Sequence, residues 1–186
     1  MTASISIRRY LDVPNSAELG DAIDKIFFES SNTKVFASAT GRATFRERWL
    51  GRYLRDDPQF AYLALTASNG VAGYLVGAIA DPASAARFGD DGYTAAFREA
   101  SKRYPAHLHL NLAPPYRGFG TGGRLIDAFV ADAQSAGAPG VHAVTSAASD
   151  NVRFYNRNGF VEVARTRSAE NRPNDPLVFL GRGVGR

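Results

Sequence analysis

The sequence contains no cysteine. This absence excludes a disulfide framework, metal sites built from thiolates and a cysteine nucleophile. It fits a reducing compartment, and the expected location is the cytoplasm. The N-terminal stretch MTASISIRRYLDVPNS lacks the apolar core of a signal peptide. No apolar run approaches the roughly 18 residues that would be needed to cross a membrane, so no membrane association is expected.

Lysine is scarce, and the net charge of +4 is carried mostly by arginine. A modest positive excess suits an anionic ligand, although it usually marks only a solvated surface. One arginine cluster lies on a predicted helix: Arg42, Arg46, Arg48, Arg52 and Arg55. No aromatic platform is interleaved with it, so we expect a solvated face paired with Glu47, Asp56 and Asp57 rather than a nucleic-acid groove.

The chain shows no internal repeat, no low-complexity tract and no linker that would divide it. Its 186 residues, 45% hydrophobic and 22% charged, are ordinary for one globular domain. We therefore predict a single domain over residues 1–186.

Hydrophobic periodicity gives the expected order of elements in the first half of the chain. Asn15 and Glu18 have the spacing that caps a helix. Asn69-Gly70 is a strong hairpin signal between two β runs. The expected elements are a strand at 4–11, a helix at 16–29, an irregular stretch at 31–41, a helix at 43–55, the hairpin within 59–81, and an insertion at 82–105 with a helix at 93–103.

The second half alternates strands and helices. Gly137 with Pro139, and Asn158 with Gly159, are predicted to end helices. The expected elements are a strand at 107–112, a helix after residue 120, a strand at 140–146, a short helix within 149–160, and an antiparallel pair at 160–166 and 176–182. This order predicts a mixed sheet with helices packed on it.

The stretch PPYRGFGTGGRL, residues 114–125, holds four glycines in six positions. Glycines let backbone amides approach a phosphate, and the N-terminus of the following helix favours negative charge. The spacing is compatible with a dinucleotide site, a P-loop or a coenzyme A loop.

Two of these interpretations conflict with the neighbouring residues. Arg124 and Leu125 stand where a P-loop needs a lysine and a Ser/Thr hydroxyl. A dinucleotide site needs its first glycine directly after the strand, but the residues 113–117 intervene. It also needs an acidic residue about 20 positions on, and the strand at 140–146 has none.

The stretch LNLAPPYRGFGTGGRLI resembles the coenzyme A loop of the GNAT superfamily, through Arg117-x-x-Gly120-x-Gly122. Farther on, FYNRNGF at 154–160 is similar to that family's aromatic-Tyr-x-x-x-Gly-Phe signature. The resemblance implies an α/β (α+β) fold: a mixed, mostly antiparallel sheet of about seven strands, with helices on both faces and splayed central parallel strands. VAGYLVGAIAD, together with YPAHLHLNL, also resembles the acetyltransferase-like domain attached to some O-GlcNAc hydrolases.

The resemblance implies where acetyl-CoA binds. The diphosphate would lie on the loop amides, and the pantetheine arm along a strand end, with the Leu112 N–H polarising the thioester carbonyl. The implied cofactor-binding residues are Leu110, Asn111, Leu112, Arg117, Gly118, Phe119, Gly120, Thr121, Gly122 and Gly123. Tyr155 matches the family's general acid. The family's usual Asn before that tyrosine is Ala148 here, so Ser149 or Asn151 is the expected substitute.

The acceptor amine must lose its proton to attack, so a base is needed. Period two places His107, His109 and Asn111 on one face of their strand. No Asp or Glu occurs from 106 to 126, which departs from the family's common carboxylate. His109 is the best candidate, followed by His107 and then His142, and Asp81 is a further possibility. Histidines at i and i+2 could bind a metal, but no third ligand is suitably spaced, so no metal is expected.

These features predict an acetyl-CoA-dependent N-acetyltransferase that works by direct attack, since no cysteine exists to carry the acetyl group. The acceptor is a small-molecule or peptide amine, and residues 30–58 and 81–105 are expected to shape its pocket. The protein would be a monomer or homodimer. The alternative is an inactive GNAT-like module that binds acetyl-CoA or another ligand.

Overall fold

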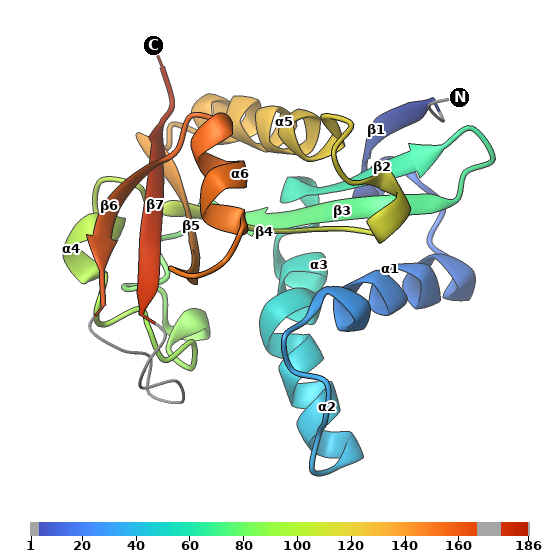
Figure 1. Cartoon of the computed structure of the whole chain (residues 1–186), viewed down its shortest axis with the longest axis horizontal. Helices are drawn as coiled ribbons and strands as arrows, with labels where there is room; N and C mark the ends of the chain where they lie inside the picture. The colour runs from blue at the N-terminus through green and yellow to red at the C-terminus, as the bar shows by residue number, and fades with distance from the viewer. Residues whose placement is uncertain (1–3, 167–175, 186) are drawn as a thin grey trace. The chain divides into compact units, whose positions relative to one another are not determined.

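A computed structural model describes residues 4–166 and 176–185, which form two compact units (Figure 1). Unit 1 takes in the residues up to Gly77 and His109–Phe129, and unit 2 takes in Ala78–Leu108 and the residues from Val130 onward. The described residues form seven strands in the order β1-β2-β3-β4-β5-β7-β6. β4 and β5 are parallel, whereas the β1–β2, β2–β3, β5–β7 and β6–β7 pairs are antiparallel. The predicted mixed, mostly antiparallel sheet of seven strands is confirmed.

Unit 1 begins with β1 (Ile5–Arg9), the short helix η1 (Tyr10–Asp12) and α1 (Ala17–Ser30). The side chain of Ser16 caps α1 by accepting a hydrogen bond from the Leu19 N–H at 3.2 Å. The predicted Asn15 cap is therefore wrong by one residue, because it is Ser16 that carries the extended backbone of an N-cap. Ile23, Ile26 and Phe27 form the buried stripe of α1.

The second helical region of unit 1 starts earlier than predicted. α2 (Ala39–Arg46) is capped by Ser38, whose hydroxyl accepts from the Gly41 N–H. It continues through the π-helical turn η2 (Glu47–Gly51) into α3 (Arg52–Asp56). The cap at Ser38 explains the early start, since Ala39–Gly41 lack a large apolar residue that would have signalled it.

The predicted solvated arginine face of this region is partly wrong. Arg46 Nε lies 2.7 Å from a carboxylate oxygen of Asp24 on α1, with both side chains 31% exposed. Arg52 is 6% exposed and therefore buried. Arg55 meets expected partners at the surface, where it pairs with Glu47 and Asp56.

The predicted hairpin joins β2 (Ala61–Thr66) to β3 (Val71–Ala78), after η3 (Pro58–Phe60). Asn69 has a φ of 62°, and the Thr66 N–H donates to the Gly70 carbonyl at 2.9 Å. Asn tolerates this left-handed backbone better than most residues, so the hairpin prediction is confirmed.

α5 (Thr121–Ser135) follows η5 (Pro114–Tyr116) and continues from unit 1 into unit 2. It ends at Gly137, whose φ of 81° requires glycine, as predicted. The Ala138 N–H donates to the Ala133 carbonyl across this turn.

Unit 2 has a sheet core and a short insertion. Its elements are η4 (Ala86–Phe88), α4 (Arg98–Ser101), β5 (Gly140–Ser146), α6 (Asn151–Arg157), β6 (Val161–Arg165) and β7 (Leu177–Gly183), and the start of β4 (Ala106–Leu112) also belongs to it. The predicted helix at 93–103 is only four residues long. Phe97 is anchored on Phe179 just before the helix starts, with ring centroids 5.5 Å apart.

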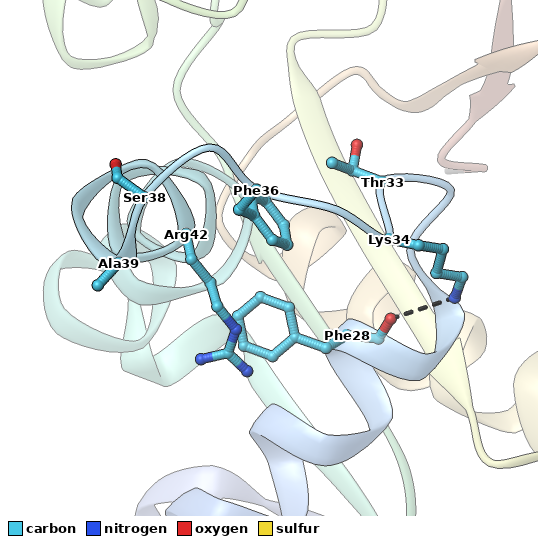
Figure 2. Close-up of a pocket in the computed structure, with 7 residues that line it drawn as sticks. All are labelled: Phe28, Thr33, Lys34, Phe36, Ser38, Ala39 and Arg42. Atoms are coloured by element: carbon cyan, nitrogen blue, oxygen red, sulfur yellow. Dashed lines mark hydrogen bonds between the residues drawn. The ribbon is translucent and has the colours of Figure 1, made fainter.

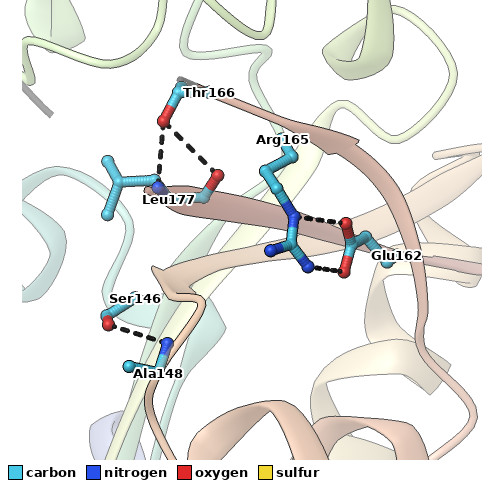
Figure 3. A network of polar contacts seen from close by, with 6 residues as sticks. All are labelled: Ser146, Ala148, Glu162, Arg165, Thr166 and Leu177. Carbon is cyan, nitrogen blue, oxygen red and sulfur yellow. Dashed lines mark hydrogen bonds and ion pairs between the residues drawn. The ribbon is translucent and has the colours of Figure 1, made fainter. Parts of the chain in front are cut away.

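The predicted antiparallel pair β6–β7 is confirmed, and polar contacts fasten it (Figure 3). Thr166 Oγ1 accepts from the Leu177 N–H at 2.9 Å, and Arg165 pairs with Glu162 on the same strand. The end of β5 turns through a bond from the Ala148 N–H to Ser146 Oγ.

Candidate active site

The glycine loop of unit 1 has the backbone that phosphate binding requires. Gly118 and Gly120 have φ values of 84° and 77°, which favour glycine. A Cβ added at either residue would meet no atom within 4 Å, so the space in front of the loop is open. The glycines are therefore required by backbone conformation and not by crowding.

The amides behind this loop lie at the start of α5. The Arg124 N–H donates to the Gly120 carbonyl at 3.1 Å, which is the first bond of the helical ladder. The N–H groups of Thr121, Gly122 and Gly123 precede that bond and have no carbonyl partner within the helix. Three predicted phosphate ligands thus come together at a positive helix end.

Arg117 has a bracing role that its motif did not reveal. Its Nε donates to the Leu112 carbonyl at 2.9 Å, and its Nη2 approaches Ser30 Oγ at 3.4 Å. The side chain therefore ties the glycine loop to the end of β4 and to the end of α1. Phe119, between the two left-handed glycines, is 64% exposed.

The predicted pantetheine residues, Leu110, Asn111 and Leu112, form the end of β4 in unit 1. Gly73 on β3 permits a close approach to them, since a Cβ there would lie 2.7 Å from the Asn111 carbonyl oxygen. Asn111 donates its side-chain N–H to the Tyr74 hydroxyl at 2.8 Å. Burial raises the pKa of Tyr74, so its phenol stays protonated.

His109 is held by two aromatic residues of the helical region. Its Nε2 lies 3.0 Å from the hydroxyl of Tyr53, which is fully buried. The Trp49 and Tyr53 rings meet the imidazole edge-on, with centroids 5.3 and 5.2 Å away. Buried Tyr and Trp side chains usually find a polar partner for their hydroxyl or N–H group, and this tendency was the available signal for the contact.

A carboxylate that sequence reasoning missed also lies in unit 1. Asp24 on α1 binds Arg46 Nε through both oxygens, at 2.8 and 2.7 Å. Both charged groups interact electrostatically with Tyr74. No local pattern predicts this arrangement, because α1 and β3 are remote along the chain.

The other two histidine candidates lie in the core of unit 2. His107 and His142 are 2% and 1% exposed and stack with ring centroids 5.5 Å apart. His142 also stacks on Phe179 and bonds through Nδ1 to the Tyr104 carbonyl oxygen. Both are placed as packed core residues, which leaves His109 as the half-exposed histidine of the three.

The remaining candidates are also in unit 2. Asp81 Oδ1 accepts from the Ala83 N–H at 2.9 Å, so this carboxylate stabilises the turn after β3. Asn151 is exposed at the start of α6, where its N–H donates to Ser149 Oγ. Tyr155 is 7% exposed and contacts the rings of Phe154 and Phe160. Burial raises the pKa of Tyr155, so the phenol keeps its proton.

His142 predicts a pH dependence of stability. Burial lowers its pKa from 6.5 to about 4. Between about pH 6.5 and pH 4, this histidine is protonated in the unfolded chain but stays neutral in the folded chain. The free energy of unfolding therefore falls by up to about 3 kcal/mol as the pH is lowered through that window. His142→Phe, which keeps a ring on Phe179, should show a shallower decline in urea unfolding between pH 7 and 4.5. Equal declines in the two proteins would contradict this assignment.

The part of the chain that the structure describes has neither a metal-binding cluster nor a membrane-spanning helix. Residues 4–166 and 176–185 contain no group of three or more His, Asp or Glu side chains arranged to hold a metal ion. Within the same residues, no helix has the length and apolar character to span a bilayer.

The chain belongs to the GNAT acetyltransferase family. The model of the acetyltransferase (GNAT) domain matches residues 67–162, more than half of the 186 residues. This match includes both β4 with its glycine loop and the segment that carries Tyr155. The predicted family is thereby confirmed.

Solved structures share the fold across their whole length. SsHAT is 21% identical with a TM-score of 0.72, and the match covers 98% of this chain and 100% of that one. A chain of the NatC complex bound to Gag peptide and CoA is 16% identical with a TM-score of 0.65, and the match covers 96% of this chain and 98% of that one. The yncA protein from Salmonella typhimurium, solved with its cofactor acetyl-CoA, is 15% identical with a TM-score of 0.64. That match covers 99% of this chain and 96% of that one.

Proposed function

We propose that this protein transfers the acetyl group of acetyl-CoA to an amine by direct attack. The observation that carries the proposal is the glycine loop, where Gly118 and Gly120 are left-handed and uncrowded and directly precede three amides at the start of α5. Such a cradle fits a diphosphate without needing a lysine. The acetyl-CoA of yncA and the CoA of the NatC complex support this choice of donor.

When bound, acetyl-CoA supplies an activated thioester. His109 is the proposed base that takes the proton of the attacking amine, and Tyr53 orients its imidazole through the 3.0 Å bond. Tyr155 is the proposed acid: its phenol donates the proton that the departing sulfur needs. The C–N bond forms as the C–S bond breaks, and CoA leaves as the thiol. The chain has no cysteine for a covalent acetyl-cysteine route.

The acceptor is an amine, of a small molecule or of a peptide. The peptide in the NatC complex supports the second class for a protein of this fold. The open space of unit 1 near residues 28–42 supports an acceptor pocket within the predicted segment 30–58.

Ligand-induced thermal stabilisation tests the proposed donor. Acetyl-CoA at about 100 times its Kd should stabilise the fold by about 2.7 kcal/mol, and a domain of this size should then melt about 5–10 °C higher. CoA should act similarly and NAD should not. No shift with either CoA species would contradict the proposal, and a shift with NAD alone would restore the dinucleotide interpretation.

A turnover assay distinguishes an active acetyltransferase from an inactive binding module. Acetylation of an amine panel at pH 8–9, where more of the acceptor is neutral, should release CoA thiol only when an amine is present. Acetyl-CoA binding with no turnover over peptides and small amines alike would favour a binding module.

Several expectations stay predictions. They are the single domain, the cytoplasmic location, the monomer or homodimer, the splayed parallel strands, and the independence from metals, nucleic acids and membranes. The closer resemblance to the domain of O-GlcNAc hydrolases also stays a prediction.

A further inference from the structure

A pocket of about 440 Å³ opens between the end of α1, the following segment and the start of α2 (Figure 2). This volume is in the range of small-molecule sites. Its lining residues are Phe28, Thr33, Lys34, Phe36, Ser38, Ala39 and Arg42. Two of them are cationic and none is acidic, so the lining is complementary to an anion.

Arg42 is ordered by an aromatic ring. Its guanidinium carbon lies 3.5 Å from the centroid of the Phe28 ring, and Phe36 meets Phe28 edge-on with centroids 5.9 Å apart. In Figure 2 the guanidinium lies beside the Phe28 ring at the pocket. Stacking leaves the N–H groups in the guanidinium plane able to bind a carboxylate through two hydrogen bonds. Because this geometry exists before a ligand arrives, less ordering is needed on binding.

Lys34 is held at the opposite side of the lining. Its Nζ donates to the Glu29 carbonyl oxygen at 2.7 Å and to the Phe28 carbonyl oxygen at 3.3 Å, at the end of α1. An ammonium has three donors, so one N–H remains for another acceptor. The two cations thus add a fixed positive field to a pocket with aromatic walls.

The α2–η2–α3 region runs from the pocket to the residues that contact His109. Arg42 lines the pocket from α2 and Arg46 ends that helix, while Trp49 lies in η2 and Tyr53 in α3. Arg46 binds Asp24, while Trp49 and Tyr53 contact His109. From residue 42 to residue 53 a helix rises about 16 Å.

We propose that this pocket binds a carboxylate of the acceptor, and that the acceptor is a peptide whose N-terminal amine reaches His109. This inference rests on the proposed function, which supplies the reaction at His109. An extended peptide covers about 3.3 Å per residue, so the carboxylate falls about four or five residues from the amine. The half-exposed Asp24–Arg46 pair along this path offers acceptors and donors to the peptide amides.

Peptide binding in the presence of CoA, measured by calorimetry, tests the proposal without turnover. Peptides that carry one Asp, moved from the second to the seventh position, are compared with Asn counterparts. Wild-type protein should bind the Asp form about tenfold more tightly, and only with Asp near the fourth or fifth position. Arg42→Gln should abolish this preference, because a neutral side chain cannot form the charged pair.

Arg87→Gln is the matched control, since Arg87 also lies over a phenylalanine ring, at 4.7 Å from Phe88 in unit 2. It should keep the Asp preference, and both variants should keep wild-type acetyl-CoA affinity and melting temperature. Equal binding of Asp and Asn forms at every position, or no peptide binding by a protein that binds acetyl-CoA, would overturn the carboxylate site and leave the proposed donor intact. Loss of acetyl-CoA binding in the wild type would instead remove the proposed function and the inference with it.

Discussion

Gly120→Val should weaken acetyl-CoA binding by about 100-fold or more. The φ of 77° at this residue disfavours any L side chain and disfavours a β-branched one most. A Cβ meets no protein atom within 4 Å, so the added methyl groups would fill the open space before the amides of α5. Loss of two charge-assisted hydrogen bonds, at about 1.5–3 kcal/mol each, accounts for a change of this size. Calorimetry with acetyl-CoA measures it.

Gly137→Val is the control that distinguishes the effect of backbone strain from loss of the acetyl-CoA site. Gly137 has a φ of 81° and also meets no atom within 4 Å, but it ends α5 in unit 2. The two variants should lose similar stability, and only Gly120→Val should lose affinity. Wild-type affinity in Gly120→Val would show that the diphosphate binds elsewhere.

Local chemistry explains why much of the fold could be predicted. The Asn69-Gly70 turn and the glycine that ends α5 each depend on neighbours a few residues away. Where local signals were weak, the predictions failed. The start of α2 has no large apolar residue, and the helix predicted at 93–103 is limited to Arg98–Ser101.

The candidate site was predictable only where a motif specifies the backbone. The glycine loop follows from its own residues, but the contacts of His109 with Trp49 and Tyr53 join segments more than fifty residues apart. Period two grouped His107 with His109 on one strand face, but it could not show that His107 is packed against Phe88 in unit 2. Likewise, Asp24 was invisible as a partner of Arg46 because nothing in the sequence sets the position of α1 beside α2.

These placements leave few residues as candidates for the proposed base and acid. With His107 and His142 in a packed core and the Asp81 carboxylate bound within a turn, His109 stays the proposed base. Burial raises the pKa of Tyr155, which suits a group that must hold a proton until the sulfur departs. We therefore expect the largest kinetic effect from removing the Tyr155 hydroxyl, because the ring can keep its contacts without it.

Tyr155→Phe should lower kcat by about 100-fold while the Kd for acetyl-CoA changes by less than about twofold. The phenyl ring can keep its contacts with Phe154 and Phe160, so the fold should remain stable. Because the pKa of Tyr155 is raised, wild-type kcat should not fall between pH 7 and about 10 through loss of this proton. Tyr104→Phe is the control, since that ring packs against Gly181 within unit 2 and has no proposed proton to give. Steady-state rates, with acetyl-CoA affinity from calorimetry, make the comparison. A Tyr155→Phe enzyme with wild-type kcat would exclude the phenol as the acid and leave water to protonate the departing sulfur.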